Sequence, residues 1–151
     1  MLFRIVSRAL PRVLLPILAA LPLAATAAQP VVEVYKTASC GCCKAWIQHL
    51  EDNGFSVKAQ DVANPGDYRA KFGIGDQHGS CHSAKVGGYA IEGHVPASDI
   101  KRMLATRPQA TGLAVPGMPM GSPGMEGAHS DPYEVLLVKK DGSTSVYKRY
   151  R

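Results

Sequence analysis

Four cysteines carry the most distinctive chemistry of this sequence of 151 residues. Three of them are crowded into Cys40-Gly41-Cys42-Cys43, where Cys40 and Cys43 form a C-x-x-C pair and Cys42 fills its second variable position. The fourth, Cys81, lies far along the chain in the polar, glycine-rich segment 73–83. Thiolates are ligands for soft metals such as Cu(I), and a pair of thiols can also exchange disulfides. The four cysteines are therefore a candidate metal site or a candidate redox site.

The segments around the first cysteines predict how the chain positions them. Residues 31–35 are apolar and β-branched, which predicts a buried strand, and Trp46, Ile47 and Leu50 recur at helical spacing after the cysteines. A strand that leads through C-x-x-C into a helix is the thioredoxin-like arrangement. Free N–H groups and the helix dipole at a helix start stabilise a thiolate, and Lys44 adds a positive charge there. Cys81 is expected to return to this place on its loop.

The remaining segments predict an α/β fold, thioredoxin-like, with a mixed central sheet and flanking helices. We expect these elements in chain order: a strand over 55–60, a helix beginning at Asn64-Pro65, a loop over 73–83, a hairpin or bent strand over 86–91, a helix from Pro96 to Arg107, and a C-terminal β-hairpin of 133–138 and 143–150 turning at Asp141-Gly142. Residues 109–132 are rich in Gly, Pro and Met, and we expect a long loop there without any regular element.

The first 28 residues have the pattern of a secretory signal peptide. Three arginines and an apolar run over 13–25 precede the small residues Ala25-Thr26-Ala27-Ala28. The run is too short, and too interrupted by proline, for a membrane span of about 20 apolar residues. We expect cleavage near Ala27 or Ala28, a periplasmic location, one thioredoxin-like copper-binding domain over 29–151, and no contact with the membrane after cleavage.

Charge and motifs exclude several classes of function. Three of the 17 Lys and Arg residues, but none of the 12 Asp and Glu residues, lie in the predicted leader, which leaves 14 basic and 12 acidic residues. Basic blocks with interleaved aromatic residues are missing, so nucleic acid is not expected as a partner. The sequence also has no P-loop, no dinucleotide fingerprint and no carboxylate pair suited to acid–base work. A conventional hydrolase is not predicted.

The cysteines allow three interpretations. In an exported protein they could form two structural disulfides, or Cys40 and Cys43 could exchange disulfides with other proteins. Exchange needs only two sulfurs, and Cys42 would invite wrong pairings, whereas an additional thiolate helps to hold Cu(I). At about 100° per residue Cys42 and Cys43 should fan apart around the helix, which favours thiolates bridging several Cu(I) ions over one shared ion. Zinc is the alternative metal, although its usual sites combine two separated C-x-x-C knuckles.

The Gly/Pro-rich loop contains three methionines whose thioethers are soft, neutral ligands. Met118, Met120 and Met125 have no helix face or core to fill there, and a thioether binds Cu(I) without losing a proton. We expect either that at least one of these methionines contacts or delivers copper, or that the loop packs as a lid over the cysteines.

The histidines are less informative than the cysteines. His82 follows Cys81 directly and is a further candidate ligand, one that would also help to hold Cu(II). His49 lies in the middle of a predicted helix and His94 near a turn or strand end, so both are expected at the surface.

Four sequence blocks are similar to a known family. They are Thr37-Ala38-Ser39-Cys40-Gly41-Cys42-Cys43, Ser80-Cys81-His82, the segment from Tyr89 to Pro96, and the segment from Ala114 to Glu126. On these residues, within a likeness that covers nearly all of 31–150, the chain resembles the CopG-type bacterial copper-resistance proteins, long catalogued as an uncharacterised conserved domain. The resemblance implies a thioredoxin-like fold, a periplasmic role in copper tolerance, and a cysteine-bridged cluster of several copper ions at the four cysteines. It also implies a redox role that interconverts Cu(I) and Cu(II).

The predicted function is therefore that of a periplasmic protein for copper resistance, which binds Cu(I) at Cys40, Cys42, Cys43 and Cys81 and redox-cycles copper. Its expected partners are copper ions and periplasmic copper donor or acceptor proteins. The alternative is a thiol–disulfide oxidoreductase that uses the Cys40/Cys43 pair. The sequence leaves open whether the chain turns over copper as an oxidoreductase.

Overall fold

A single seven-stranded sheet runs through the computed structural model, which describes residues 30–151. In chain order the elements are β1 (Val32–Lys36), α1 (Gly41–Asp52), β2 (Val57–Asp61), α2 (Pro65–Lys71), the 3-10 helix η1 (Asp76–His78), β3 (His82–Val86), β4 (Tyr89–Glu92), α3 (Ala97–Thr106), β5 (Gly112–Ala114), β6 (Tyr133–Val138) and β7 (Thr144–Tyr150). The predicted signal peptide, residues 1–28, lies outside the described residues.

The sheet is mixed, with the strand order β2-β1-β3-β4-β5-β6-β7. The pairs β1–β2 and β4–β5 are parallel, and the other neighbouring pairs are antiparallel. The predicted α/β class, the flanking helices and the C-terminal hairpin are confirmed. The part β2-β1-β3-β4 is compatible with the predicted thioredoxin-like arrangement. Within residues 30–151 no helix is long and apolar enough to cross a membrane.

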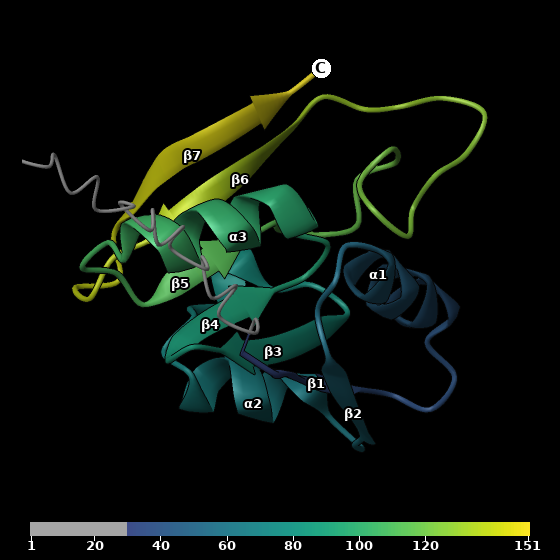
Figure 1. The fold of residues 1–151 in the computed structure, drawn as a ribbon, viewed down its shortest axis with the longest axis horizontal. Helices are drawn as coiled ribbons and strands as arrows, with labels where there is room; N and C mark the ends of the chain where they lie inside the picture. Colours follow the sequence, from purple (N-terminus) through teal and green to yellow (C-terminus); the bar gives the residue numbers. More distant parts are fainter. Residues whose placement is uncertain (1–29) are drawn as a thin grey trace, which may run out of the picture.

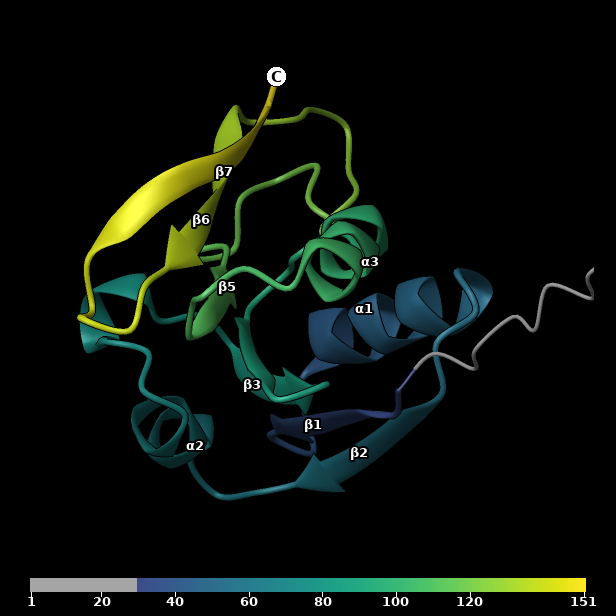
Figure 2. The same ribbon diagram turned by 60° about the vertical axis from the view of Figure 1, so that its left-hand side comes forward.

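Different helices cover the two faces of the sheet, with α1 and α3 on one side and α2 on the other (Figures 1 and 2). Successive side chains of a strand point to opposite faces of the sheet, so β1 contributes side chains to the packing on both faces. Val32 and Val34 belong to the main core together with Trp46 of α1. On the other face, Tyr35 stacks on Tyr68 of α2 with ring centroids 3.9 Å apart.

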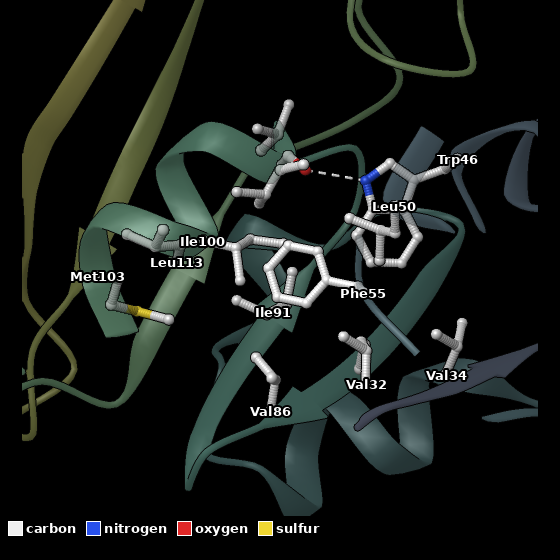
Figure 3. Close-up of a cluster of buried hydrophobic side chains, with 14 of the residues drawn as sticks. Val32, Val34, Trp46, Leu50, Phe55, Val86, Ile91, Ile100, Met103 and Leu113 are labelled. Carbon is white, nitrogen blue, oxygen red and sulfur yellow. Dashed lines mark hydrogen bonds between the residues drawn. The ribbon is translucent and has the colours of Figure 1, made fainter. Parts of the chain in front are cut away.

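The main core holds α1, and with it the cysteines at the start of α1, against the sheet and α3 (Figure 3). Trp46, Leu50, Ile100 and Met103 are fully buried in it. Burying each large apolar side chain stabilises the fold by roughly 1.5–3 kcal/mol. The Trp46 indole N–H also donates a hydrogen bond to the Val95 carbonyl at 2.9 Å. The start of α1 is therefore supported by packing on several sides.

The strand β5 corrects the prediction that residues 109–132 contain no regular element. All three of its residues are buried, and they pair with β4 on one side and β6 on the other. At Gly112 a Cβ atom would overlap the backbone of Ala90, so only glycine allows this close approach of two strands. A strand of three residues that includes glycine has almost no pattern of its own, and its neighbours in the sheet select it.

Several boundaries also differ from the predictions. β2 begins at Val57 and is largely exposed, while Phe55 precedes it and is buried in the core. β3 begins at His82, inside the predicted loop 73–83. His49 is half-buried, contrary to the expected surface position, because α1 presents it to α3, where its Nε2 accepts a hydrogen bond from the Ala97 N–H at 3.1 Å.

Candidate metal centre

Three cysteines occupy the start of α1. Cys40 is the N-cap residue, and its Sγ accepts a hydrogen bond from the Cys43 N–H at 3.3 Å. An N-cap side chain that accepts in this way satisfies one of the free N–H groups of the first helical turn. Cys42 is half-buried and Cys43 is fully buried. The cap folds the Cys40 sulfur back over the helix start, and the structure joins it to Cys43 in a disulfide.

Cys81 reaches the same place through the sheet. The chain leaves β1 just before Cys40, and the antiparallel pairing of β1 with β3 brings the start of β3 to that end of β1. Cys81 immediately precedes β3. Its Sγ lies 3.5 Å from Cys43 Sγ and 3.7 Å from Cys42 Sγ. The structure therefore shows the predicted return of Cys81 to the first cysteines.

The four sulfurs form a compact group that could hold metal once the disulfide is reduced. Cys42 Sγ lies 3.6 Å from Cys40 Sγ, and all four sulfurs lie within 4.8 Å of one another. Cys42 and Cys43 both approach Cys81, although they lie at different angles around the helix start. The expectation that this spread favours several bridged ions over one shared ion stays a prediction.

A buried carboxylate fixes the turn that presents Cys81. Glu92 of β4 is fully buried, and one of its oxygens accepts hydrogen bonds from the Ser80 N–H at 2.8 Å and from Arg69 at 3.3 Å. Burial raises the pKa of Glu92, while hydrogen bonds from Ser83 and Ser80 and the positive charge of Arg69 act against that rise. The turn before β3 is thus anchored to the neighbouring strand, so Cys81 does not sit on a free loop.

Two imidazoles lie against the Cys81 sulfur. His82 Nδ1 is 3.3 Å from Cys81 Sγ, and His94 Nε2 is 3.0 Å from it. Both histidines are fully buried. Cys81, His82 and His94 form a second group whose ligand atoms lie within 4.8 Å of one another. The structure therefore brings the predicted candidate His82 to the site, and it adds His94.

The expectation that His94 is exposed is wrong, and the predicted hairpin contained the signal that would have corrected it. β3 and β4 turn at Gly87 and Gly88, whose φ angles of 55° and 88° suit a two-residue hairpin turn. In this hairpin Ser83 lies opposite Glu92. Extending the same register by two residues sets Cys81 opposite His94, so a hairpin centred on Gly87-Gly88 predicts their meeting.

The electrostatics of the site favour neutral imidazoles. Burial, with a smaller contribution from the neighbouring His94, lowers the pKa of His82 to about 3. Burial also lowers the pKa of His94, against the opposing effects of its hydrogen bond to Pro123 and the charge of Glu126. Burial, together with the neighbouring Cys42, raises the pKa of the Cys81 thiol to about 12. Neutral imidazoles can bind metal, and a bound cation would draw the proton from a coordinating thiol.

The Gly/Pro/Met loop packs over the start of α1 (Figure 1). The Pro123 carbonyl accepts a hydrogen bond from His94 Nδ1 at 2.8 Å. At Gly124 a Cβ atom would lie 2.7 Å from both the Cys42 carbonyl oxygen and the Trp46 nitrogen. The loop thus lies as a lid beside the cysteines, which is one of the two predicted arrangements.

The loop methionines differ in exposure. Met118 is 50% exposed, while Met120 and Met125 are half-buried. Met125 directly follows Gly124, the residue that contacts the cysteine turn, and its carbonyl accepts a hydrogen bond from the Gly121 N–H at 2.8 Å. A role for these methionines in contacting or delivering copper stays a prediction.

Two solved structures described as copper resistance protein CopG are similar to this chain. Form 2 is 43% identical with a TM-score of 0.77, and the match covers 82% of this chain and 99% of that one. Form 1 is also 43% identical with a TM-score of 0.76, covering 81% of this chain and 98% of that one. A family model described as a protein of unknown function, DUF411, matches residues 78–125. No curated protein sequence matches the chain.

Proposed function

Because the chain belongs to the family of the copper resistance protein CopG, we propose that it binds copper for copper resistance through Cys40, Cys42, Cys43 and Cys81. One observation carries the proposal: four sulfurs from two distant segments lie within 4.8 Å of one another. Thiolate ligands select soft Cu(I) over harder metals. Binding takes place in the periplasm after removal of the predicted signal peptide, residues 1–28, and periplasmic copper donor or acceptor proteins exchange the metal.

In our proposal the sulfurs bridge several Cu(I) ions. Cys42 Sγ has the sulfurs of Cys40 and Cys81 as neighbours, and Cys81 Sγ has those of Cys42 and Cys43. A bridging thiolate needs this arrangement, in which one sulfur faces the positions of two metals. Four sulfurs at this spacing would also suit one tetrahedral zinc ion. The number of bound ions therefore distinguishes a cluster of several Cu(I) ions from a single zinc ion.

The Cys40–Cys43 disulfide means that the proposed site exists in an oxidised form, with this bond, and in a reduced form, with four thiols. While these two sulfurs are bonded to each other, only Cys42 and Cys81 are free among the four. A dithiol reductant restores the other two thiols, and the reduced chain then accepts copper. The neighbouring His82 and the methionines Met118, Met120 and Met125 complete the site or deliver copper to it, and the bound copper cycles between Cu(I) and Cu(II).

Anaerobic reconstitution tests this function. The reduced protein is loaded with Cu(I), copper is counted by native mass spectrometry, and thiols are counted before and after loading. We expect more than one copper per chain and a sulfur-to-copper absorption in the ultraviolet, both lost when all four cysteines become serine. A Met103→Leu variant is the matched control, because Met103 is a sulfur residue buried in the core. At most one copper per chain would contradict the cluster, and no bound copper would contradict the function.

The disulfide also supports a second candidate function, thiol–disulfide exchange through Cys40 and Cys43. It lies at the start of α1 and joins the two sulfurs that such an exchange would use. In the exchange, a thiolate of the reduced pair attacks a disulfide of another protein and displaces one of its sulfurs, and the second thiol then forms the Cys40–Cys43 bond and releases the other sulfur, so that the partner is reduced as the pair is oxidised. Reduction of insulin at a catalytic rate, unaffected by Cys42→Ser, would favour this function over copper binding.

A further inference from the structure

We propose that a cavity at the opposite end of β4 from His94 binds a small organic carboxylate with an apolar body. The cavity has a volume of about 590 Å³ and lies between the β3–β4 turn, the end of α3, the connection from α3 to β5 and the β6–β7 turn. In Figure 1 the last two of these segments lie together on the left, away from α1. The volume is within the range of about 300–1,000 Å³ that is usual for small-molecule sites. This inference is independent of the proposed copper site.

The charged side chains that line the cavity are all positive. Arg107 contributes a guanidinium at the end of α3, Lys140 contributes an ammonium from the β6–β7 turn, and none of the lining residues is acidic. Both cations are exposed and form no ion pair within residues 30–151, whereas Arg69, Arg102 and Arg149 each pair with a carboxylate. An anion bound between Arg107 and Lys140 would therefore supply the counter-charge that the described part of the chain does not.

The backbone of Arg107 adopts a conformation that favours glycine. Its φ and ψ angles are 46° and 54°, and among residues 30–151 it is the only residue other than glycine with a positive φ. Glycine is the usual residue where a helix ends in this left-handed conformation, and the following Pro108 favours extended backbone at the residue before it. The helix α3 therefore ends with arginine where glycine would be less strained. A function for the guanidinium in the cavity accounts for the arginine at this position.

Hydrogen bonds fix the connection from α3 to β5, which forms one wall of the cavity. The Tyr89 hydroxyl and the Ala110 N–H both donate a hydrogen bond to the Pro108 carbonyl at 2.9 Å. The Thr111 N–H donates to the Val138 carbonyl at 2.8 Å. The wall is thus held to β4 on one side and to β6 on the other before a ligand arrives. A site that is already formed avoids the cost of ordering a loop on binding.

Apolar side chains line much of the remaining surface of the cavity. Leu104 of α3 is half-buried, Ala110 is buried, and Pro30 and Pro108 add further apolar surface. At Gly87 a Cβ atom would lie 2.7 Å from Leu104 Cδ2, so glycine lets the β3–β4 turn approach this side chain closely. A guanidinium binds a carboxylate through two parallel hydrogen bonds, and the apolar surface beside it suits a hydrocarbon ring or chain. This combination defines the class of ligand.

Benzoate is the probe that tests the inference, and benzyl alcohol is its neutral counterpart. Each is added to the isotope-labelled protein, and nuclear magnetic resonance follows the backbone amide signals of Gly87, Gly88 and Ala110, which line the cavity. We expect benzoate to shift these signals to saturation, with a dissociation constant of about 1–10 mM for so small a ligand. Benzyl alcohol lacks the charge that the two cations recognise, so it should bind about 10-fold more weakly.

Substitution of Arg107 separates its charge from its place in the fold. Arg107→Gly removes the guanidinium and suits the left-handed backbone, so it should weaken benzoate binding about 10-fold while the urea midpoint of unfolding stays the same or rises. Arg151→Gly is the matched control, because it removes one arginine outside the cavity, and it should leave benzoate binding unchanged. Should Arg107→Gly not fold, as judged by circular dichroism, Lys140→Gln decides in the same way.

Three outcomes would overturn the inference. Equal binding of benzoate and benzyl alcohol would show that the cations take no part, as would unchanged benzoate binding in Arg107→Gly. Signals that do not approach saturation at about 50 mM benzoate, well above the expected dissociation constant, would show that no site exists. If inorganic phosphate shifts the same signals at the same concentrations as benzoate, the apolar surface takes no part, and the assignment to an organic carboxylate is wrong.

Discussion

Replacing His82 by phenylalanine should remove much of the acid sensitivity of the metal-free protein. The folded state buries the imidazole away from solvent, and this burial together with the neighbouring His94 lowers the pKa of His82 to about 3, against an ordinary value of 6.5. Between these two values the unfolded chain binds a proton that the folded chain does not. Folding stability therefore falls as the pH drops from 6.5 towards 3, and the loss is complete below about pH 3.

The size of the effect follows from the width of this pH window. Lowering the pH from about 7.5 to about 5 protonates nearly all unfolded chains at His82 and almost no folded ones, which costs about 2 kcal/mol of unfolding free energy. The groups that face the ring are Cys81 and His94, and Lys36 lies opposite on β1 with its ammonium paired to Asp61 at 2.5 Å. These groups remain in the variant, so their own titrations largely cancel in the comparison.

Urea unfolding at the two pH values measures the effect. The difference in unfolding free energy between them should be about 2 kcal/mol smaller in His82→Phe than in the unchanged protein. His129→Phe, at an exposed position, should keep the full difference. Comparing the two pH values within each protein removes any constant packing effect of the larger ring. An unaltered pH dependence in His82→Phe would refute the assignment of a buried, neutral imidazole at this position.

Three further predictions concern the surroundings of the cysteines. Cys42→Ser should lower the number of Cu(I) ions per chain in native mass spectrometry, since its sulfur lies between two others, and should leave the circular dichroism unchanged. Trp46→Phe should lower the urea-unfolding free energy by about 1–3 kcal/mol, because the buried Val95 carbonyl loses its donor. Gly124→Ala should speed copper release to a chelator, because Gly124 has φ +84° and its new methyl group would push the loop off the Cys42 carbonyl.

Periodicity was sufficient to predict the elements with a strong pattern of their own. The helix that carries Trp46 and Leu50 and the hairpin around Gly142 lie where the sequence indicates. The strand β5 could not be predicted in this way, because its conformation depends on the two strands beside it. At Gly112 the deciding fact is the nearness of the Ala90 backbone, which exists only after folding.

The candidate site could also be predicted only in part, because some of its residues are neighbours in the sequence and others meet only through the fold. Cys40, Cys42 and Cys43 are neighbours in the sequence, and their spacing predicted a common site. His94 was wrongly predicted at the surface, because the residues next to it in the sequence resemble a turn. Its burial follows from the register of β3 against β4. The position of Cys40 could not be derived from a helical angle, because Cys40 is an N-cap residue that lies outside the helix.

Cys81 has a position that neither the cysteine motif nor the histidines explain separately. It stands where β3 meets the end of β1, so its sulfur faces the helix start, and it stands opposite His94 in the β3–β4 hairpin, so the same sulfur faces the imidazoles. Serine at Cys81 would therefore break both groups at once, whereas serine at Cys42 would spare the imidazole side. Cys81→Ser should therefore lower the number of Cu(I) ions per chain in native mass spectrometry more than Cys42→Ser does, and equal losses in the two variants would contradict this central position of the Cys81 sulfur.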